Sequence, residues 1–154
     1  MKTLLSVNGQ LTPDSSKTHI SYYFDVDGKG AKLDFLFSYE PKKLVNIEKS
    51  HELIEECINK YSDRDKKKFL SNWEAYLPIQ NLITISIDDS VGFRGAAHRH
   101  SPNQELFIAE ACASPGLLPG KLVAGKWRVT ISAHTVATDV CNYKLCVLEK
   151  EVEL

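Results

Sequence analysis

The 154-residue sequence predicts a mainly β fold, an antiparallel β-sandwich, on the strength of three observations. Apolar residues alternate with polar ones in several short segments, which is typical of strands that bury one face. Glycine and proline separate these segments, as turns do in sandwiches. Only one stretch, at about residues 42–76, has helical spacing instead. We therefore expect a single domain over residues 1–154, with a helical insertion at about 42–76.

The first clear strand pattern lies between His19 and Tyr39. Two runs flank the segment 27–30, and their alternating apolar members are Ile20, Tyr22, Phe24 and Val26, then Leu33, Phe35, Phe37 and Tyr39. Gly28 and Gly30 lie between the runs, and glycine adopts the positive φ angles that tight turns require. The pattern predicts a β-hairpin.

Four further strands are expected in the second half of the chain, at about residues 83–87, 105–110, 127–131 and 143–147. Trp127 is followed by Val129 and Ile131 at alternate positions, so its ring is expected in the core rather than at a sugar-binding surface. Tyr23 and Phe93 are the aromatic residues expected to be exposed, Tyr23 because it alternates with the buried row of its strand.

The helical insertion is expected to contain two helices. The first covers residues 52–60 with Ser50 as its N-cap, and its apolar residues recur at helical spacing. The second covers residues 65–76 and is expected to bury Phe69, Trp73 and Tyr76. The charged run at residues 63–68 is interpreted as a solvated face rather than a basic binding patch, because it also contains two aspartates.

Composition disfavours several classes of protein. The net charge is −1, with 19 basic and 20 acidic residues spread along the chain, so we expect no nucleic-acid partner. We expect neither a signal peptide nor a membrane-spanning stretch, because the apolar runs are too short, and the four cysteines match no metal knuckle or disulfide framework. We therefore expect a cytoplasmic protein with reduced thiols and no membrane partner.

The densest group of functional side chains lies in residues 88–100, which are expected to leave a strand and enter a loop. The predicted ligand-binding residues are Asp88, Arg94, His98, Arg99 and, from a later strand end, His134. Guanidinium groups bind carboxylate, phosphate or hydroxyl oxygens in a fixed geometry, so the expected ligand is a small polar molecule.

Two other interpretations of this segment remain open. In one, carboxylates and imidazoles from the loop bind a divalent metal, with His98, His100 and His134 as ligands; the neighbouring arginines disfavour this, because they would repel the ion. In the other, the aspartates make turn hydrogen bonds and the arginines pair with carboxylates. No nucleophile motif or phosphate-binding loop is found, so we predict no catalytic residue, no metal and no cofactor.

Several motifs resemble a known family. They are the run Pro78–Asp89, the block Gly92–Arg99, the run Ser114–Gly120 taken with Gly125–Trp127, His134, and the run Cys141–Leu145. Together these segments are similar to the β-sandwich domain that precedes the metallohydrolase domain in CehA/McbA-like proteins of the PHP superfamily. The resemblance covers roughly residues 21–148.

The resemblance implies a jelly-roll or galactose-binding-like accessory sandwich. In that family the metals are held by the downstream PHP domain, and this sequence ends at Leu154, where such a domain would begin. We therefore expect a noncatalytic binding or interaction module for a carbohydrate, a small anionic ligand or a partner hydrolase. The alternative is a small metal-dependent hydrolase that uses the region of His98, His100 and His134.

Overall fold

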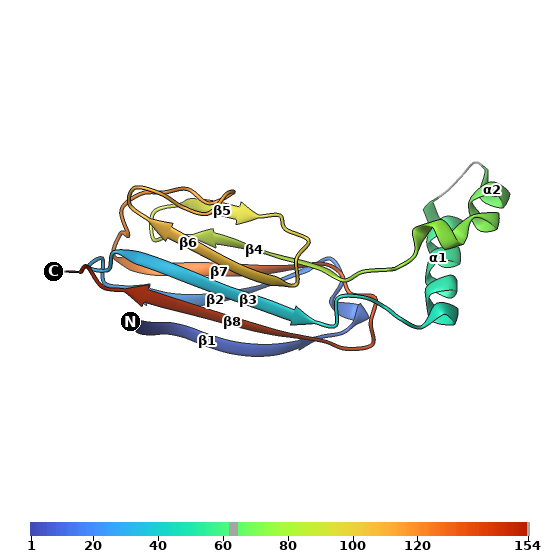
Figure 1. The fold of residues 1–154 in the computed structure, drawn as a ribbon, viewed down its shortest axis with the longest axis horizontal. Helices are drawn as coiled ribbons and strands as arrows, with labels where there is room; N and C mark the ends of the chain where they lie inside the picture. Colours follow the sequence, from blue (N-terminus) through green and yellow to red (C-terminus); the bar gives the residue numbers. More distant parts are fainter. Residues whose placement is uncertain (62–64, 154) are drawn as a thin grey trace.

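The computed structural model of this chain describes residues 1–61 and 65–153. Two antiparallel four-stranded sheets pack face to face, so the predicted β-sandwich is confirmed (Figure 1). The first sheet has the order β1-β8-β3-β6 and the second has the order β2-β7-β4-β5. The strands are β1 (Lys2–Leu11), β2 (Thr18–Val26), β3 (Lys32–Glu40), β4 (Leu82–Asp88), β5 (Phe93–Ala97), β6 (Asn103–Ala109), β7 (Gly125–Thr135) and β8 (Cys141–Lys150).

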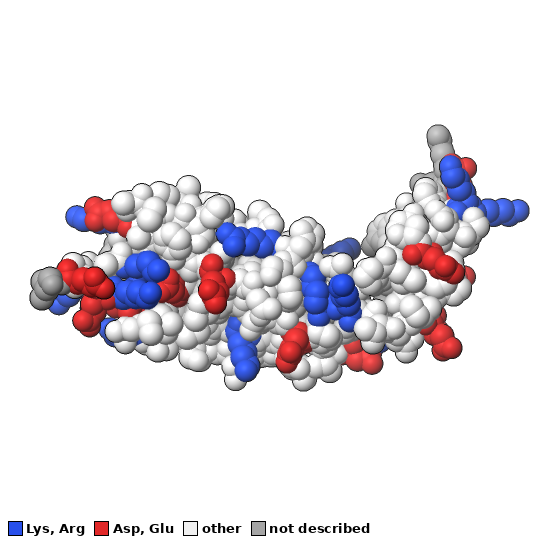
Figure 2. Space-filling view, in the orientation of Figure 1, with Lys and Arg blue, Asp and Glu red and all other residues white. Residues whose placement is uncertain are grey.

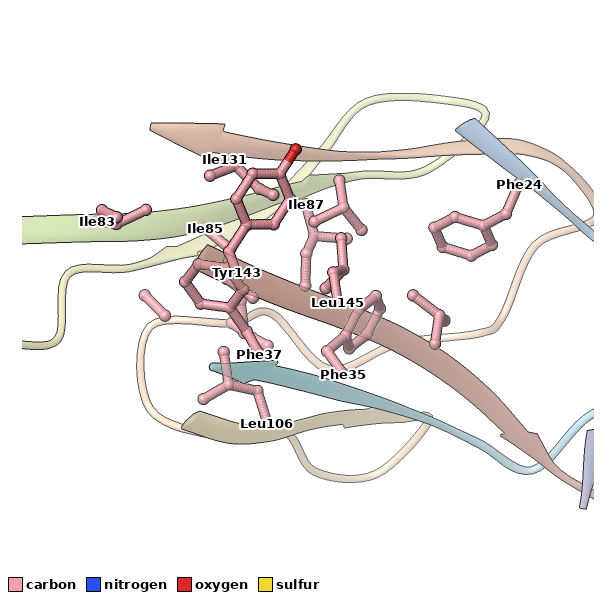
Figure 3. Packing of buried hydrophobic residues seen from close by; sticks show 14 of the residues in the cluster. Phe24, Phe35, Phe37, Ile83, Ile85, Ile87, Leu106, Ile131, Tyr143 and Leu145 are labelled. Atoms are coloured by element: carbon pink, nitrogen blue, oxygen red, sulfur yellow. The ribbon is translucent and has the colours of Figure 1, made fainter. Parts of the chain in front are cut away.

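A continuous hydrophobic core fills the space between the two sheets (Figure 3). Alternate residues of β2, β3, β4, β6, β7 and β8 belong to it, as the period of two predicts. Trp127 is fully buried, with Val129 and Ile131 beside it in β7, and its indole Nε1 donates a hydrogen bond to the Val123 carbonyl at 2.9 Å. The predicted burial of this tryptophan is confirmed.

The predicted hairpin at residues 19–39 is wrong, although both of its strands exist. β2 pairs with β7 in the second sheet, whereas β3 pairs with β6 and β8 in the first. Gly28 has a φ of 79° in the connection, which crosses from one sheet to the other instead of returning along the same sheet. A period of two indicates which face of a strand is buried, but it does not indicate which strand is its neighbour in the sheet.

Two strands were not predicted. β5 lies within the segment that was expected to be a loop, where glycine and alanine hide the alternation. β1 shows no clear alternation of apolar residues, because Gly9 occupies an inward position that would ordinarily be apolar. The ring of Tyr143, the partner of Gly9 in β8, fills the space where a side chain at position 9 would lie. Tyr143 reaches across the core to Tyr22, and their hydroxyl oxygens are 2.5 Å apart.

The helical insertion follows β3 and projects from the end of the sandwich opposite the two termini (Figure 1). It contains α1 (Ile47–Tyr61), α2 (Lys66–Ser71) and the short 3-10 helix η2 (Trp73–Tyr76), and another short 3-10 helix, η1 (Pro13–Ser15), follows β1. No helix in residues 1–61 or 65–153 is long and apolar enough to cross a membrane.

The details of the insertion differ from the prediction. α1 begins before Ser50, because Asn46 Oδ1 accepts the Lys49 backbone N–H at 2.9 Å, and Ser50 lies inside the helix with its hydroxyl donating to the Asn46 carbonyl. The second predicted helix divides into α2 and η2, and Phe69 and Tyr76 are exposed rather than buried. In the charged run, residues 63 and 64 lie outside the described residues, and Lys66–Lys68 are exposed.

Asn81 anchors the base of the insertion. Its side chain is fully buried; Nδ2 donates to the Pro41 carbonyl and to Thr138 Oγ1, both at 2.9 Å, and Oδ1 accepts the Ala137 backbone N–H at 2.7 Å. The backbone N–H of Asn81 donates to the Lys42 carbonyl at 2.8 Å. The Asn81 side chain thus joins the segment that enters the insertion, at Pro41, and the segment that leaves it, at Asn81 itself, to the turn between β7 and β8.

We expect Asn81→Ala to lower the free energy of unfolding by about 2–3 kcal/mol, because it leaves a buried amide and a buried carbonyl without partners. Urea unfolding followed by circular dichroism measures this loss. Asn59→Ala, at an exposed position in α1, is the control and should change stability by less than about 0.5 kcal/mol. Equal effects of the two substitutions would contradict the anchoring role.

Candidate functional site

The outer face of the β2-β7-β4-β5 sheet gathers polar side chains from three neighbouring strands. Because side chains alternate along a strand, the residues between the buried ones point to solvent. In β7 the outward residues are therefore Arg128, Thr130, Ser132 and His134. Asp88 and His134, two of the predicted site residues, belong to this face.

The first row across this face consists of Tyr23, Arg128 and Asp88, which lie opposite one another in the register of β2, β7 and β4. Arg128 donates to Asp88 Oδ2 from Nη2 at 3.0 Å and from Nε at 3.3 Å. Asp88, and to a smaller extent Tyr23, raise the pKa of Arg128. Tyr23 is 56% exposed, as predicted. The row places a fixed cation between a carboxylate and an accessible aromatic ring.

The next two rows carry hydroxyl and imidazole groups. Ser21 Oγ and Thr130 Oγ1 are 3.0 Å apart, and His19 Nδ1 lies 2.9 Å from Ser132 Oγ. β4 adds another hydroxyl to the row of Thr130, because Ser86 lies opposite Thr130. Each hydroxyl both donates and accepts hydrogen bonds, so the face presents both kinds of group to a ligand.

His134 closes the far end of the face. Its Nε2 lies 2.8 Å from Thr84 Oγ1, and the ring is exposed. The last pair in the register of β4 and β5 is that of Ile85 with Ala97, and His98 follows Ala97 directly. The structure therefore places His98, just past the end of β5, at the same end of the sheet as His134.

The remaining loop residues lie past the end of β5. His98 and His100 are exposed and Arg99 is half-buried. Gln104 Nε2 donates to the Ser101 carbonyl at 3.0 Å, which holds the turn that leads from these residues into β6. The predicted binding role of Arg99 stays a prediction, as does that of His98.

Arg94 lies apart from this face, in the interior. Only 7% of it is exposed, and its guanidinium carbon is 5.1 Å from the centre of the Trp127 ring. All five N–H groups find acceptors within the protein: Nε and Nη2 donate to the Leu118 carbonyl, Nη2 to that of Gly120, and Nη1 to that of Lys121 and to Asp89 Oδ2. Its predicted role in binding is untested, and the structure gives it a second role as a clamp on residues 118–121.

Asp89 completes the clamp. Its Oδ1 accepts the backbone N–H groups of Val91 at 2.7 Å and Gly92 at 2.8 Å, and its Oδ2 pairs with Arg94 at 3.0 Å. Burial raises the pKa of this carboxyl, but the hydrogen bonds from Val91 and Gly92 and the Arg94 guanidinium outweigh it, so the pKa is lowered. The turn interpretation of the aspartates is therefore correct for Asp89, whereas Asp88 bonds across the strands to Arg128.

Sequence reasoning missed the partners that complete the outer face, which are Arg128, Thr130, Ser132, His19 and Ser21. A signal for them was present, since each occupies the outward position of a strand whose inward residues were identified. Within residues 1–61 and 65–153, no three histidine, cysteine, aspartate or glutamate side chains come close enough to hold a metal ion.

Comparison with known proteins gives no family. No family model matches the chain, and no curated protein matches it either. Among solved structures, a crystal structure of a protein from Sulfurospirillum deleyianum is similar over 96% of this chain and 99% of its own, with 8% identity and a TM-score of 0.38. This likeness is too weak to carry an argument about function.

Proposed function

We propose that this protein is a noncatalytic binding module, and that the outer face of the β2-β7-β4-β5 sheet binds a hydroxylated ligand such as an oligosaccharide. The observation that carries the proposal is the row of Tyr23, Arg128 and Asp88, which combines an exposed ring with a fixed cation and a carboxylate. An aromatic face covers the apolar side of a sugar ring, and charged groups hydrogen-bond its hydroxyls.

The shape and extent of the face support an extended ligand. From Arg128 to His134 the rows of β7 span about 20 Å at about 3.3 Å per residue. Between these two ends the outward side chains of β7, Thr130 and Ser132, are short. A ligand lying along the strands would meet hydroxyls throughout and an aromatic ring at one end.

We also infer a jelly-roll connectivity, which the strand orders β1-β8-β3-β6 and β2-β7-β4-β5 support. Every connection between consecutive strands crosses from one sheet to the other, except that from β4 to β5, which pair within the second sheet. This connectivity agrees with the accessory-domain resemblance, and sandwiches of this kind include many lectin domains. The argument for binding rests on the side chains of the face, because a fold alone does not determine function.

Tyr23→Ala should weaken oligosaccharide binding by at least about tenfold, because it removes the ring without touching the core. Candidate glycans are found by screening the protein on an array of neutral and uronic-acid oligosaccharides, and titration calorimetry then gives the affinity. Arg128→Ala should have a similar effect.

Tyr76→Ala is the matched control, because Tyr76 is 49% exposed but lies in the helical insertion. It should leave the affinity unchanged. If no glycan binds at millimolar concentration, or if Tyr23→Ala and Tyr76→Ala behave alike, the outer face is not a sugar-binding surface.

A further inference from the structure

A second feature of the molecule, separate from the polar face, is an apolar hollow between the helical insertion and the end of the sandwich. The space-filling view shows the surface hollowed between these two parts (Figure 2). The hollow has a volume of about 690 Å³. Its apolar walls come from α1, from the segment around η2 and from the end of β7, and they include Leu53, Cys57, Phe69, Ile79 and Val136.

The side chains around the hollow are unusually apolar for a surface. Tyr61 is 63% exposed, Tyr76 49% and Phe69 38%, and all three line the hollow. Accessible aromatic and aliphatic groups that gather in one concave region mark a binding site more often than scattered ones do. A hollow of this volume lies within the range of sites for small molecules.

Two lysines lie beside Tyr61 at the rim. Lys17 Nζ donates a hydrogen bond of 3.5 Å to the Tyr61 hydroxyl, and Lys60 Nζ is 5.3 Å from the centre of the ring. The hydrogen bonds from Lys17 and Lys60 lower the pKa of Tyr61. Glu56 also lines the hollow, and among the described residues at this rim the two ammonium groups outnumber it. The rim at Tyr61 is therefore cationic.

The backbone fixes one of these lysines in place. Lys17 has a φ of 64°, a left-handed conformation that is uncommon for a residue with a side chain, and its N–H donates to the Ala133 carbonyl at 2.7 Å. This conformation follows η1 and turns the chain from the edge of the first sheet into β2. The lysine thus belongs to the rigid sandwich, whereas Lys60 belongs to the insertion.

We propose that the hollow binds an amphiphile with a single anionic headgroup, such as a fatty acid, with its acyl chain against the apolar walls and its carboxylate at Lys17, Lys60 and Tyr61. Charge complementarity favours this occupant, because two ammonium groups and a phenol hydroxyl provide donors for a carboxylate at one end of a mostly apolar hollow. A cationic amphiphile with the same chain has no matching partner at that rim.

Titration calorimetry with dodecanoate at low ionic strength tests the proposal on the whole chain. Dodecanoate should bind, dodecyltrimethylammonium should bind at least about tenfold more weakly, and each methylene removed from the carboxylate should weaken binding about fourfold. The double variant Lys17→Ala, Lys60→Ala should lose about tenfold in affinity for dodecanoate. Its control is Lys67→Ala, Lys68→Ala, which removes two exposed lysines of α2 and should change nothing.

A second variant tests the apolar wall. Cys57→Glu replaces an exposed residue of the hollow with a carboxylate and should reduce dodecanoate binding more than tenfold, whereas Asn59→Glu adds the same charge to α1 outside the hollow and should not. Equal binding of the two headgroups, or equal effects of these two variants, overturns the proposal. If dodecanoate does not bind and sedimentation velocity finds a dimer that Cys57→Glu abolishes, the occupant is a second copy of the chain, which also overturns it.

Discussion

Trp127→Ala should lower the free energy of unfolding by about 3–5 kcal/mol, because it removes the largest side chain of the core and leaves a cavity between the sheets. Trp127 is fully buried, packs 6.2 Å from Phe24 between ring centres, and donates to the Val123 carbonyl. The substitution also leaves that carbonyl without its partner. Guanidinium unfolding followed by circular dichroism measures the change.

The second tryptophan provides the control. Trp73 lies in η2 and stacks on His51 with 4.3 Å between ring centres, on a part of the insertion that is half-buried. Trp73→Ala should cost about 1 kcal/mol or less, since no enclosed cavity forms. A near-neutral Trp127→Ala would show that the ring does not support the core and would contradict its observed burial.

Most of the strands, though not β1 and β5, could be predicted from the sequence, because burial of one face leaves a period of two and this period is local. Ile83, Ile85 and Ile87 all proved buried where the pattern placed them. Strand pairing is not local. β2 and β3 are adjacent in the sequence but lie in different sheets. The alternation around Phe24 in β2 and around Phe35 in β3 would be the same if the two strands formed a hairpin.

The helical insertion illustrates the opposite difficulty. The spacing of Ile54 and Ile58 located α1, and both side chains are buried. Phe69 and Tyr76 also recur at helical spacing but are exposed, because burial depends on whether another element covers the side chain. The position of a helix can be inferred from its spacing, whereas the surface that covers it depends on the tertiary structure.

The candidate site was predictable only in part for a similar reason. Asp88 and His134 occupy outward positions of strands, so their place on the outer face follows from the pattern, with Asp88 half-buried and His134 exposed. Arg94 is buried because the carbonyls of Leu118, Gly120 and Lys121 converge on it, and backbone carbonyls leave no signature in a sequence. A charged residue beside glycine and aspartate looks the same whether it faces a ligand or clamps a loop.

Replacing Arg94 with methionine should lower the free energy of unfolding by about 3–5 kcal/mol. The substitution leaves the Asp89 carboxylate, whose side chain is only 8% exposed, without its charge partner. It also leaves the carbonyls of Leu118, Gly120 and Lys121 without their donor. The segment that contains them bonds to two edge strands, one in each sheet: the Ala96 N–H of β5 donates to the Gly116 carbonyl, and the Gly120 N–H donates to the Ala109 carbonyl of β6.

Arg128→Met is the matched control, because Arg128 pairs with Asp88 at the same distance of 3.0 Å but its side chain is 44% exposed. An exposed ion pair contributes only about 0–1 kcal/mol, so this variant should remain nearly as stable as the parent protein. Equal losses of stability for the two arginine variants would contradict the clamp.

The cost of Arg94→Met should also depend on pH. The pKa of Asp89 is lowered in the folded protein, so the stabilisation is complete above the unfolded value of about 3.9 and is lost as the pH falls through the folded value. In the Arg94→Met variant one of the groups that lower the pKa of Asp89 is absent. Once the Asp89 carboxyl is protonated it carries no charge, so the loss of the Arg94 cation no longer destabilises it. The stability difference between parent and variant should therefore be constant near neutral pH and shrink below about pH 4. A difference that stays constant down to pH 2 would show that the clamp acts through its carbonyl hydrogen bonds alone.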